Sequence, residues 1–446
     1  ATTGSFSLSG VASVTVGTGD FSTGAMSLTG TASFTQTGDN GAASFSQSVA
    51  SLSTAAGTTC VWDNNNNGGS LRIDRGRLGG VRIEASQGRL WLAATDLETS
   101  LLMHLGADGE LARCVVPARE LLNRVKASRA PFCELHGDKN VLVVNGGGVE
   151  HRLNTLPVAE FPLIPQRAEG QVICVSAGPF REALGTALAG VAETSTRYAI
   201  HGVLLEVADG VRLVATDGRR MVGVELRGDA GEAGSCQAIL PPKLCKLVRQ
   251  VVDKNDESTL NLYVKAAVDT QDPEPPELYL AGAGWLAHCR GAEGNFPMWR
   301  DIVPRGGSRF MVSRSELLGV LREIAPAGSG GRGVRLRLAG ESSTVTYRGP
   351  ETGESTGRVR TRFMGGGDSL IVTGFNAAFV IEALATLPGD QVVIEVQQNK
   401  PSTHDSVSHL PALLYDWPSR KVSWVIMPIS LGLPASPESL GSNYKA

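Results

Sequence analysis

The chain has 446 residues, with 41 Lys and Arg against 44 Asp and Glu, and a net charge of −3 at pH 7. This length predicts roughly two to four domains, and 19% charged residues with no long apolar run exclude a wholly disordered chain and a membrane-spanning helix. The seven cysteines are scattered without Cys-x-x-Cys spacing. They indicate neither a zinc site nor a disulfide framework, and they favour a cytoplasmic protein.

Residues 1–70 differ in composition from all that follows. They contain no Lys, Arg or Pro, and segments that start at Gly4 and Gly24 repeat with apolar residues alternating with Ser or Thr, which indicates strands. The segment lacks the basic start and continuous apolar core of a signal peptide. We interpret it as a flexible or weakly β-forming extension, with a small β-repeat module as the alternative, and residues 64–69 as its closing turn.

Beyond the extension the chain repeats itself. The hairpin from Gly80 to Asp96 recurs from Gly202 to Asp217, an offset of about 121 residues, and a fainter third copy starts at Gly333. In each copy a later strand runs into a helix start, and two copies close on Phe-Pro. The offsets predict three domains of roughly 120 residues, at residues 71–168, 169–306 and 307–431, with a tail at 432–446.

Helical periodicity places helices within the copies. In the second copy, Phe180, Leu184 and Leu188 form one apolar stripe, and Leu244 and Leu247 belong to another. Basic residues lie away from the stripe in the second copy and beside Leu122 in the first: Lys243, Lys246, Arg249, Arg119, Arg124 and Lys126. One face is therefore predicted to be core and another basic. An ordinary solvated helix surface is the alternative interpretation of the basic face.

Taken together, these landmarks resemble the bacterial beta sliding clamp, the processivity subunit of DNA polymerase III. The resemblance covers roughly residues 71–431 and rests on the triple repeat, the Thr-Asp-Gly-Arg-Arg-Met turn from Thr216, the Phe296-Pro297 segment, Gly374-Phe375-Asn376, and the terminal run that starts at Trp424. It implies an α+β fold of three repeated clamp domains, the DNA clamp fold, with helices lining a pore inside a continuous outer β layer. It also implies a head-to-tail dimeric ring.

The resemblance implies a non-catalytic function. A ring is held on duplex DNA by topology, so it needs only sequence-independent phosphate contacts, and a net charge near zero agrees with that. The implied partners are double-stranded DNA, the DNA polymerase III alpha subunit, the clamp loader, repair polymerases, mismatch-repair proteins and a second copy of the chain. No cofactor and no metal are implied.

The partner site implied by the resemblance is a hydrophobic pocket between the second and third domains that accepts a short peptide. Apolar walls with a Met adapt to several Leu- or Phe-bearing peptides, and Arg supplies polar contacts at the rim. A plain core strand is the alternative for residues 425–429. The matching positions are Ile200, Thr216, Gly218, Arg219, Arg220, Met221, Pro297, Ile302, Val425, Ile426, Met427, Pro428 and Ile429. Asp301 and Ser430 stand where that family usually has basic residues.

The other implied sites bind DNA and the second subunit. The DNA-binding positions are Arg197, Tyr198, Lys243, Lys246, Arg249, Arg124, Lys126 and Asn376. A buried core aromatic is the alternative for Tyr198, and Phe379 departs from the family because it cannot donate a hydrogen bond. The dimer interface matches His151 and Leu153 on one side and Ala325 and Pro326 on the other. The family starts with a pore helix, of which Phe45, Val49 and Leu52 are the only helical spacing here.

Two alternatives remain. Asp96 and Asp217 recur in equivalent places, as a duplicated acid and base pair would, but Thr precedes each Asp, whereas aspartic peptidases need Asp-Thr-Gly or Asp-Ser-Gly. No phosphate loop, Ser-His-Asp set or metal cluster appears in the sequence, so we predict no catalytic residue. The second alternative is a secreted or surface β-repeat protein without a DNA function.

Overall fold

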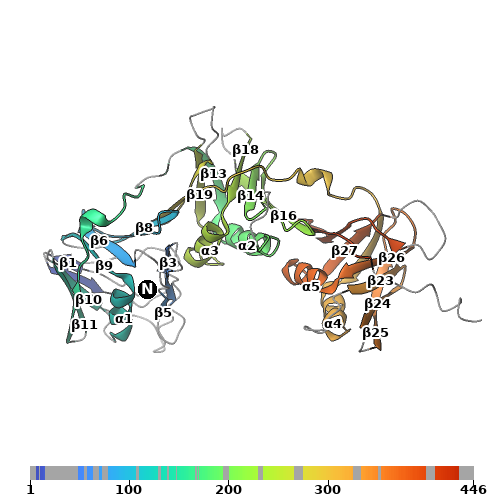
Figure 1. Cartoon of the computed structure of the whole chain (residues 1–446), viewed down its shortest axis with the longest axis horizontal. Coiled ribbons are helices and arrows are strands. Elements are labelled where there is room, and N and C mark those ends of the chain that lie inside the picture. Colours follow the sequence, from blue (N-terminus) through green and yellow to red (C-terminus); the bar gives the residue numbers. More distant parts are fainter. Residues whose placement is uncertain are drawn as a thin grey trace, which may run out of the picture. The chain divides into compact units, whose positions relative to one another are not determined.

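Figure 1 shows the chain in a computed structural model. The structure describes residues 7–9, 11–15, 49–54, 58–63, 70–72, 79–106, 110–128, 132–137, 140–146, 148–165, 168, 170–193, 200–229, 235–265, 275–324, 333–349, 353–397 and 407–430, and only the backbone of those before residue 79. Phe45, Arg197, Tyr198, Ala325, Pro326 and the turn at 64–69 lie outside these ranges. No helix in the described ranges has the length and apolar character needed to cross a membrane.

The chain divides into two compact units. The first is built from Ala1–Leu188, Thr196–Leu213 and Leu226–Asn295, and the second from Ala189–Ser195, Val214–Glu225 and Phe296–Ala446. The units do not test the three-domain division at 71–168, 169–306 and 307–431, which stays a prediction.

The extension and the first copy are mostly strands. The extension contributes β1 (Ser7–Ser9), β2 (Val11–Thr15), β3 (Val49–Thr54), β4 (Thr58–Asp63) and β5 (Ser70–Arg72). The first copy follows with β6 (Gly80–Ser86), β7 (Arg89–Thr95), β8 (Thr99–Gly106), β9 (Leu111–Pro117), α1 (Ala118–Ala127), β10 (Phe132–Gly137), β11 (Val141–Gly146), β12 (Val149–Asn154) and the 3₁₀ turn η1 (Val158–Glu160). Val49 and Leu52, whose helical spacing is the only trace of the family's pore helix, lie in strand β3, so the described residues form no helix at this trace.

The second and third copies add four helices. The second has β13 (Gln171–Ser176), α2 (Ala177–Leu188), β14 (Val203–Val207), β15 (Val211–Thr216), β16 (Arg220–Leu226), β17 (Gly228–Asp229), β18 (Cys236–Leu240), α3 (Pro242–Val251), β19 (Thr259–Lys265), β20 (Glu277–Gly282), β21 (Trp285–Arg290) and η2 (Trp299–Asp301). The third has β22 (Ser308–Ser313), α4 (Arg314–Ile324), β23 (Gly333–Ala339), β24 (Ser342–Gly349), β25 (Gly353–Phe363), β26 (Leu370–Asn376), α5 (Ala377–Thr386), β27 (Gln391–Val396), β28 (Val407–Ser408), β29 (Ala412–Asp416) and β30 (Val422–Ile426).

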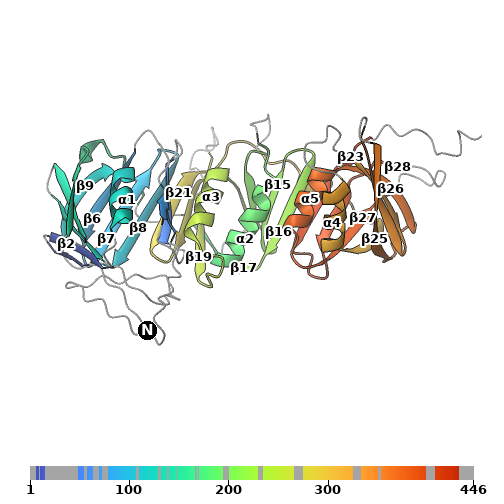
Figure 2. The same cartoon turned by 90° about the horizontal axis from the view of Figure 1, so that it is seen from below.

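The predicted helices are confirmed as α1, α2 and α3, and of their apolar stripes Leu122, Phe180 and Leu184 are buried while Leu188 is half-buried. Prolines 117 and 241 precede α1 and α3, which suits a helix start because proline lacks the N–H that the first turn leaves unpaired. Leu244, Leu247 and Val248 of α3 are buried, while Lys246 is exposed. Figure 2 shows the helices of both units in front of their strands.

Neighbouring copies are joined by strand ladders. In the first unit β8 pairs antiparallel with β21, with Thr99 opposite Cys289 and Met103 opposite Trp285. In the second unit β16 pairs antiparallel with β30. Each ladder makes one sheet out of strands from two copies.

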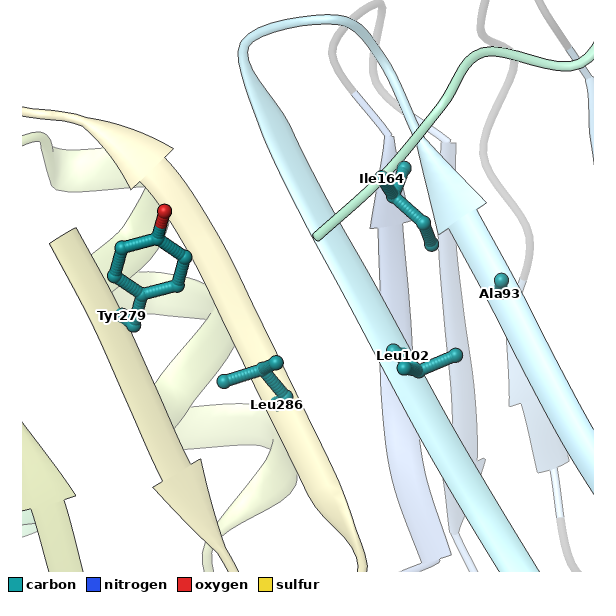
Figure 3. Close-up of a cluster of buried hydrophobic side chains, with 5 residues drawn as sticks. All are labelled: Ala93, Leu102, Ile164, Tyr279 and Leu286. Atoms are coloured by element: carbon teal, nitrogen blue, oxygen red, sulfur yellow. The ribbon is translucent and has the colours of Figure 1, made fainter. Parts of the chain in front are cut away.

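A hydrophobic cluster stabilises the first of these ladders (Figure 3). It combines Ala93 of β7, Leu102 of β8, Tyr279 of β20 and Leu286 of β21 with Ile164 from the segment after η1, all at most 8% exposed. Alternating strand residues place these side chains on one face of the sheet. Burial of each large side chain contributes about 1.5–3 kcal/mol.

The turns after β7 and β15 have the same hydrogen bonds, which confirms the repeat at atomic level. The Thr95 hydroxyl donates to the Thr99 carbonyl at 3.2 Å and accepts from the Leu97 N–H at 3.1 Å. The Asp96 carboxylate accepts from the N–H groups of Glu98 and Thr99. The third turn residue is left-handed in both copies, with φ of 78° at Leu97 and 83° at Gly218. The recurring Asp is therefore a turn residue.

These two turns predict opposite effects of exchanging their third residue. A non-glycine residue in the left-handed region costs about 1–2 kcal/mol, and Leu97 is 74% exposed, so Leu97→Gly gives up little burial. We expect Leu97→Gly to raise the free energy of unfolding by about 0.5 kcal/mol, because part of the relief is lost to unfolded-state entropy. Gly218→Leu should lower it by about 1 kcal/mol. Urea titration followed by Trp fluorescence measures the free energy of unfolding of both variants. If both variants shift it by the same amount in the same direction, the two turns are not equivalent.

Candidate functional site

The hairpin turn between β15 and β16 carries the sequence-predicted site. The Thr216 hydroxyl donates to the Arg220 carbonyl at 2.7 Å and accepts from the Gly218 N–H at 3.1 Å. The Asp217 carboxylate accepts from the N–H groups of Arg219 and Arg220, both at 2.9 Å. These bonds close the turn and leave the Arg219 side chain exposed.

Arg220 fixes this turn to helix α5. Its Nε donates to Asp217 Oδ2 at 3.0 Å and its Nη1 donates to Glu382 Oε2 at 2.5 Å. The guanidinium carbon lies 4.5 Å from the centre of the Phe379 ring and 5.7 Å from that of Trp424. The Arg220 side chain is only 10% exposed and Asp217 is 19% exposed, so their ion pair is partly shielded from solvent, whereas Glu382 at 43% stays in contact with water.

Strand β30 emerges from the core beside this turn. Trp424 is fully buried and its indole N–H donates to the Thr386 hydroxyl at 2.9 Å, and Ile426 is also fully buried. The Met427 N–H then donates to the Arg219 carbonyl at 2.9 Å, and the Met427 side chain is 39% exposed. The strand is therefore core up to Ile426, and Met427 is the first exposed residue after it.

The structure sorts the predicted pocket residues by exposure. Buried residues are Ile200, Thr216, Met221, Val425 and Ile426; half-buried ones are Pro297, Arg220, Pro428 and Ile429; exposed ones are Gly218, Arg219, Ile302 and Met427. Ile200 belongs to the first unit and all the others to the second. The backbone joins Met427 to Arg219, while Pro297 and Ile302 lie on the separate segment around η2. That segment also exposes Met298, which the sequence reasoning missed.

Several predicted DNA-binding residues already have protein partners. Lys243 forms ion pairs with Asp96 and Glu98, and Arg124 pairs with Glu120 at 3.5 Å. The carbonyl of Arg249 accepts from Arg181 Nε at 3.1 Å, and its guanidinium packs against Gly185. Lys246 and Lys126 are exposed. Arg197 and Tyr198 lie outside the described residues.

Asn376 has a structural role in addition to any predicted contact. It caps α5, because its side-chain oxygen accepts from the Ala378 N–H at 3.0 Å. Phe379, one turn further on, lies against Arg220. On β12, Leu153 is 5% exposed and His151 is half-buried. Ala325 and Pro326 lie outside the described residues.

Glu382 is a structural partner of Arg220 that the sequence analysis did not identify. It lies three residues after Phe379 on α5, a spacing that puts both side chains on one helix face. An acidic residue at that spacing on a helix without basic residues was the available signal. Nothing in the sequence said which Arg would face it.

The site offers apolar side chains and a guanidinium rather than a reacting group. Exposed Met427 and Ile302 supply apolar area, and Arg219 supplies directional donors. Within the described ranges, no group of three or more His, Cys, Asp and Glu residues has an arrangement that could hold a metal ion. The arrangement is suited to binding a polypeptide segment.

The Arg220 contacts predict a large effect of removing its side chain. Arg220→Ala should lower the free energy of unfolding by about 2 kcal/mol, less than for a fully buried pair because Glu382 is 43% exposed and stays hydrated. Arg219→Ala is the matched control, with an expected change within about 0.5 kcal/mol. Urea titration of both variants measures the difference. A loss of the same size in both would show that Arg220 does not anchor the turn.

Comparison with curated proteins finds beta sliding clamps. The chain is 24% identical over 364 residues to the beta sliding clamp of Pseudomonas aeruginosa and 27% identical over 371 residues to that of Vibrio cholerae. Each match covers 79% of this chain and 92% of the relative. No family model matches the chain.

Solved structures agree with these matches. The sliding clamp of Pseudomonas aeruginosa solved with a ligand is 23% identical with a TM-score of 0.68, and the DNA polymerase III beta subunit of Thermotoga maritima is 24% identical with a TM-score of 0.67. Each covers 79% of this chain and 92% of the solved one. The chain therefore has the sliding-clamp fold, as its sequence predicted.

Proposed function

We propose that this chain, a divergent relative of the bacterial beta sliding clamps, encircles duplex DNA and holds the replicative polymerase on it as a processivity factor. The observation that carries the proposal is the way in which copies are joined, through the β8–β21 and β16–β30 ladders. The same kind of ladder, repeated between chains, closes a ring.

We propose β12 and β25 as the two strands of such a ladder between chains. β12 is the last strand of its sheet, in the order β1-β2-β10-β11-β12. In the described part of the chain, residues 353–360 of β25 pair only with β24, because β22 joins β25 from Thr361 onward. An unpaired edge is a template for another strand. Pairing of β12 with the partner's β25 gives a head-to-tail homodimer.

The subunit contact proposed from the sequence fits this arrangement. His151 and Leu153 belong to β12, while Ala325 and Pro326 follow α4, the helix that packs along β25. The Arg360 N–H of β25 donates to Glu316 of α4 at 3.0 Å. We propose these four residues as the two sides of the dimer contact.

The proposed DNA contacts are few and electrostatic. Lys246 and Lys126 are exposed, and Arg124 is 46% exposed, so all three have water-accessible charge for phosphate oxygens. Lys243 contributes less, because Asp96 and Glu98 offset its charge. Arg197, Tyr198, Arg249 and Asn376 complete the proposed set. A ring that is held on DNA by topology does not need a higher affinity for the phosphates.

The proposed partner site is the surface of Arg219, Met427 and Pro428, with Ile302 and Pro297 as further apolar contacts. It would bind a peptide of the DNA polymerase III alpha subunit and, in turn, of the clamp loader, repair polymerases and mismatch-repair proteins. One solved sliding clamp of Pseudomonas aeruginosa has griselimycin bound. We propose a cytoplasmic, non-catalytic protein without a cofactor. The alternative of a surface β-repeat protein gains no support from relatives that cover 79% of the chain.

The partner site predicts a specific binding defect. Met427→Ala with Pro428→Ala should weaken a fluorescein-labelled Leu- and Phe-bearing polymerase peptide by about tenfold or more, because a buried Met side chain contributes about 1.5–3 kcal/mol. Fluorescence polarisation measures the affinity. Leu163→Ala, at a side chain that is 98% exposed in the first unit, is the control and should leave affinity unchanged. If the unmodified chain, the double variant and the Leu163→Ala control all bind the peptide with equal affinity, the partner site lies elsewhere on the molecule.

The ring predicts that DNA ends, rather than salt, release the protein. Protein loaded on a closed circular plasmid should stay bound through a salt wash and leave after one restriction cut, as measured by gel filtration of the plasmid. Neutralising Arg124, Lys126 and Lys246 to Gln should slow loading but leave retention unchanged. Binding by phosphates alone would instead weaken by roughly 10³–10⁵ between 50 and 200 mM salt for six to ten contacts. A variant that is dimeric by light scattering yet leaves circles as fast as linear DNA would refute the proposal.

A further inference from the structure

The second and third copies show what a complete copy contains. Each begins with a strand that runs directly into a helix: β13 into α2, and β22 into α4. These first strands pair with the strand that follows the second helix of the copy, β13 with β19 and β22 with β27. The two helices also pack on one another, α2 on α3 and α4 on α5.

In the first copy, a strand of the N-terminal extension occupies the position of the first strand. β10 follows α1 as β19 follows α3, so β10 is the equivalent strand. Its partner is β2, antiparallel, with Thr15 opposite Phe132, Val14 opposite Cys133 and Ala12 opposite Leu135. β2 therefore holds the place of β13 and β22, although 64 residues separate it from β6.

A second part of the extension lies where a partner helix would pack on α1. Strands β4 and β5 contact α1, and β3 contacts β7, β8 and α3. β3, β4 and β5 form one antiparallel sheet. Figure 1 shows β5 beside α1, and Figure 2 shows β2 at the same end of the first unit as β6 and β9.

We propose that the edge of β10 and the open side of α1 form an intramolecular binding surface whose occupant is the chain's own N-terminal segment. β2 takes the place of the first strand, and β3, β4 and β5 take the place of the first helix as a small sheet. The segment is thus an integral part of the first copy. This inference goes beyond the proposed function and holds whether or not the chain encircles DNA.

Backbone hydrogen bonding explains why the segment binds at this edge. An edge strand with unpaired N–H and C=O groups invites pairing, and β2 satisfies β10 without needing large apolar side chains. That suits a segment rich in Gly, Ser and Thr. The replacement also differs in charge: Arg72 of β5 is the one Lys or Arg in residues 1–72, whereas α4 alone carries Arg314 and Arg322.

Hydrogen exchange of the full chain and two truncations tests the assignment. Removing residues 1–20 should raise the rate of amide hydrogen exchange at least tenfold in residues 132–135 of β10. The equivalent strand β19 keeps its own partner and should stay protected. Removing residues 1–72 should in addition raise exchange in α1 but not in α5. Unchanged exchange in β10 after the first truncation, or unprotected residues 11–15 in the full chain, would overturn the proposal.

A cross-link in the full chain tests the same register without truncation. Val14 is the register partner of the free Cys133, and directly opposed strand residues lie within disulfide reach, so Val14→Cys is the test variant. Mild oxidation should link position 14 to Cys133, as peptide mapping by mass spectrometry detects. Ser13→Cys is the matched control, because residue 13 is the register partner of Glu134 and lies one position away from the partner of Cys133. No link at position 14, or an equal yield from position 13, would overturn the proposed pairing.

Discussion

Strand pairing across copies is the interaction on which the rest of the molecule depends. Each copy has strands whose backbone groups need a partner, and β8 and β16 find one in the last strand of the next copy. Because backbone ladders tolerate many side chains, the arrangement survives at the low identity that separates this chain from its relatives. The same constraint explains why β10 is covered by a strand from a distant part of the chain.

The turns show how the sheets are tied to the helices. The Asp96 turn follows β7 of the first copy, and its carboxylates hold Lys243 at the start of α3 in the second. The Asp217 turn follows β15 of the second copy, and its own Arg220 holds Glu382 on α5 in the third. The cation sits on the helix in one case and on the turn in the other. The recurring Asp residues are therefore structural, which removes the reason to suspect an acid and base pair.

The same anchoring shapes the proposed partner site. Arg220 is occupied by Asp217, Glu382 and the Phe379 ring, so it supports the turn rather than reaching outward. Arg219, whose carbonyl accepts from Met427, remains the exposed donor. A peptide on this surface would meet a turn that is already rigid, and less entropy is lost on binding to a preorganised surface.

The sequence by itself determined the repeat, the helices and the fold. Apolar spacing fixed which faces of α2 and α3 are buried, since periodicity is a local property of the chain. Only the tertiary structure decided which predicted residues are exposed: Val425 and Ile426 are core while Met427 is not, although all three are apolar neighbours. It also decided that Lys243 meets carboxylates from the first copy and that Arg220, not Arg219, meets Glu382. These outcomes depend on contacts between residues more than a hundred positions apart, which no local pattern encodes.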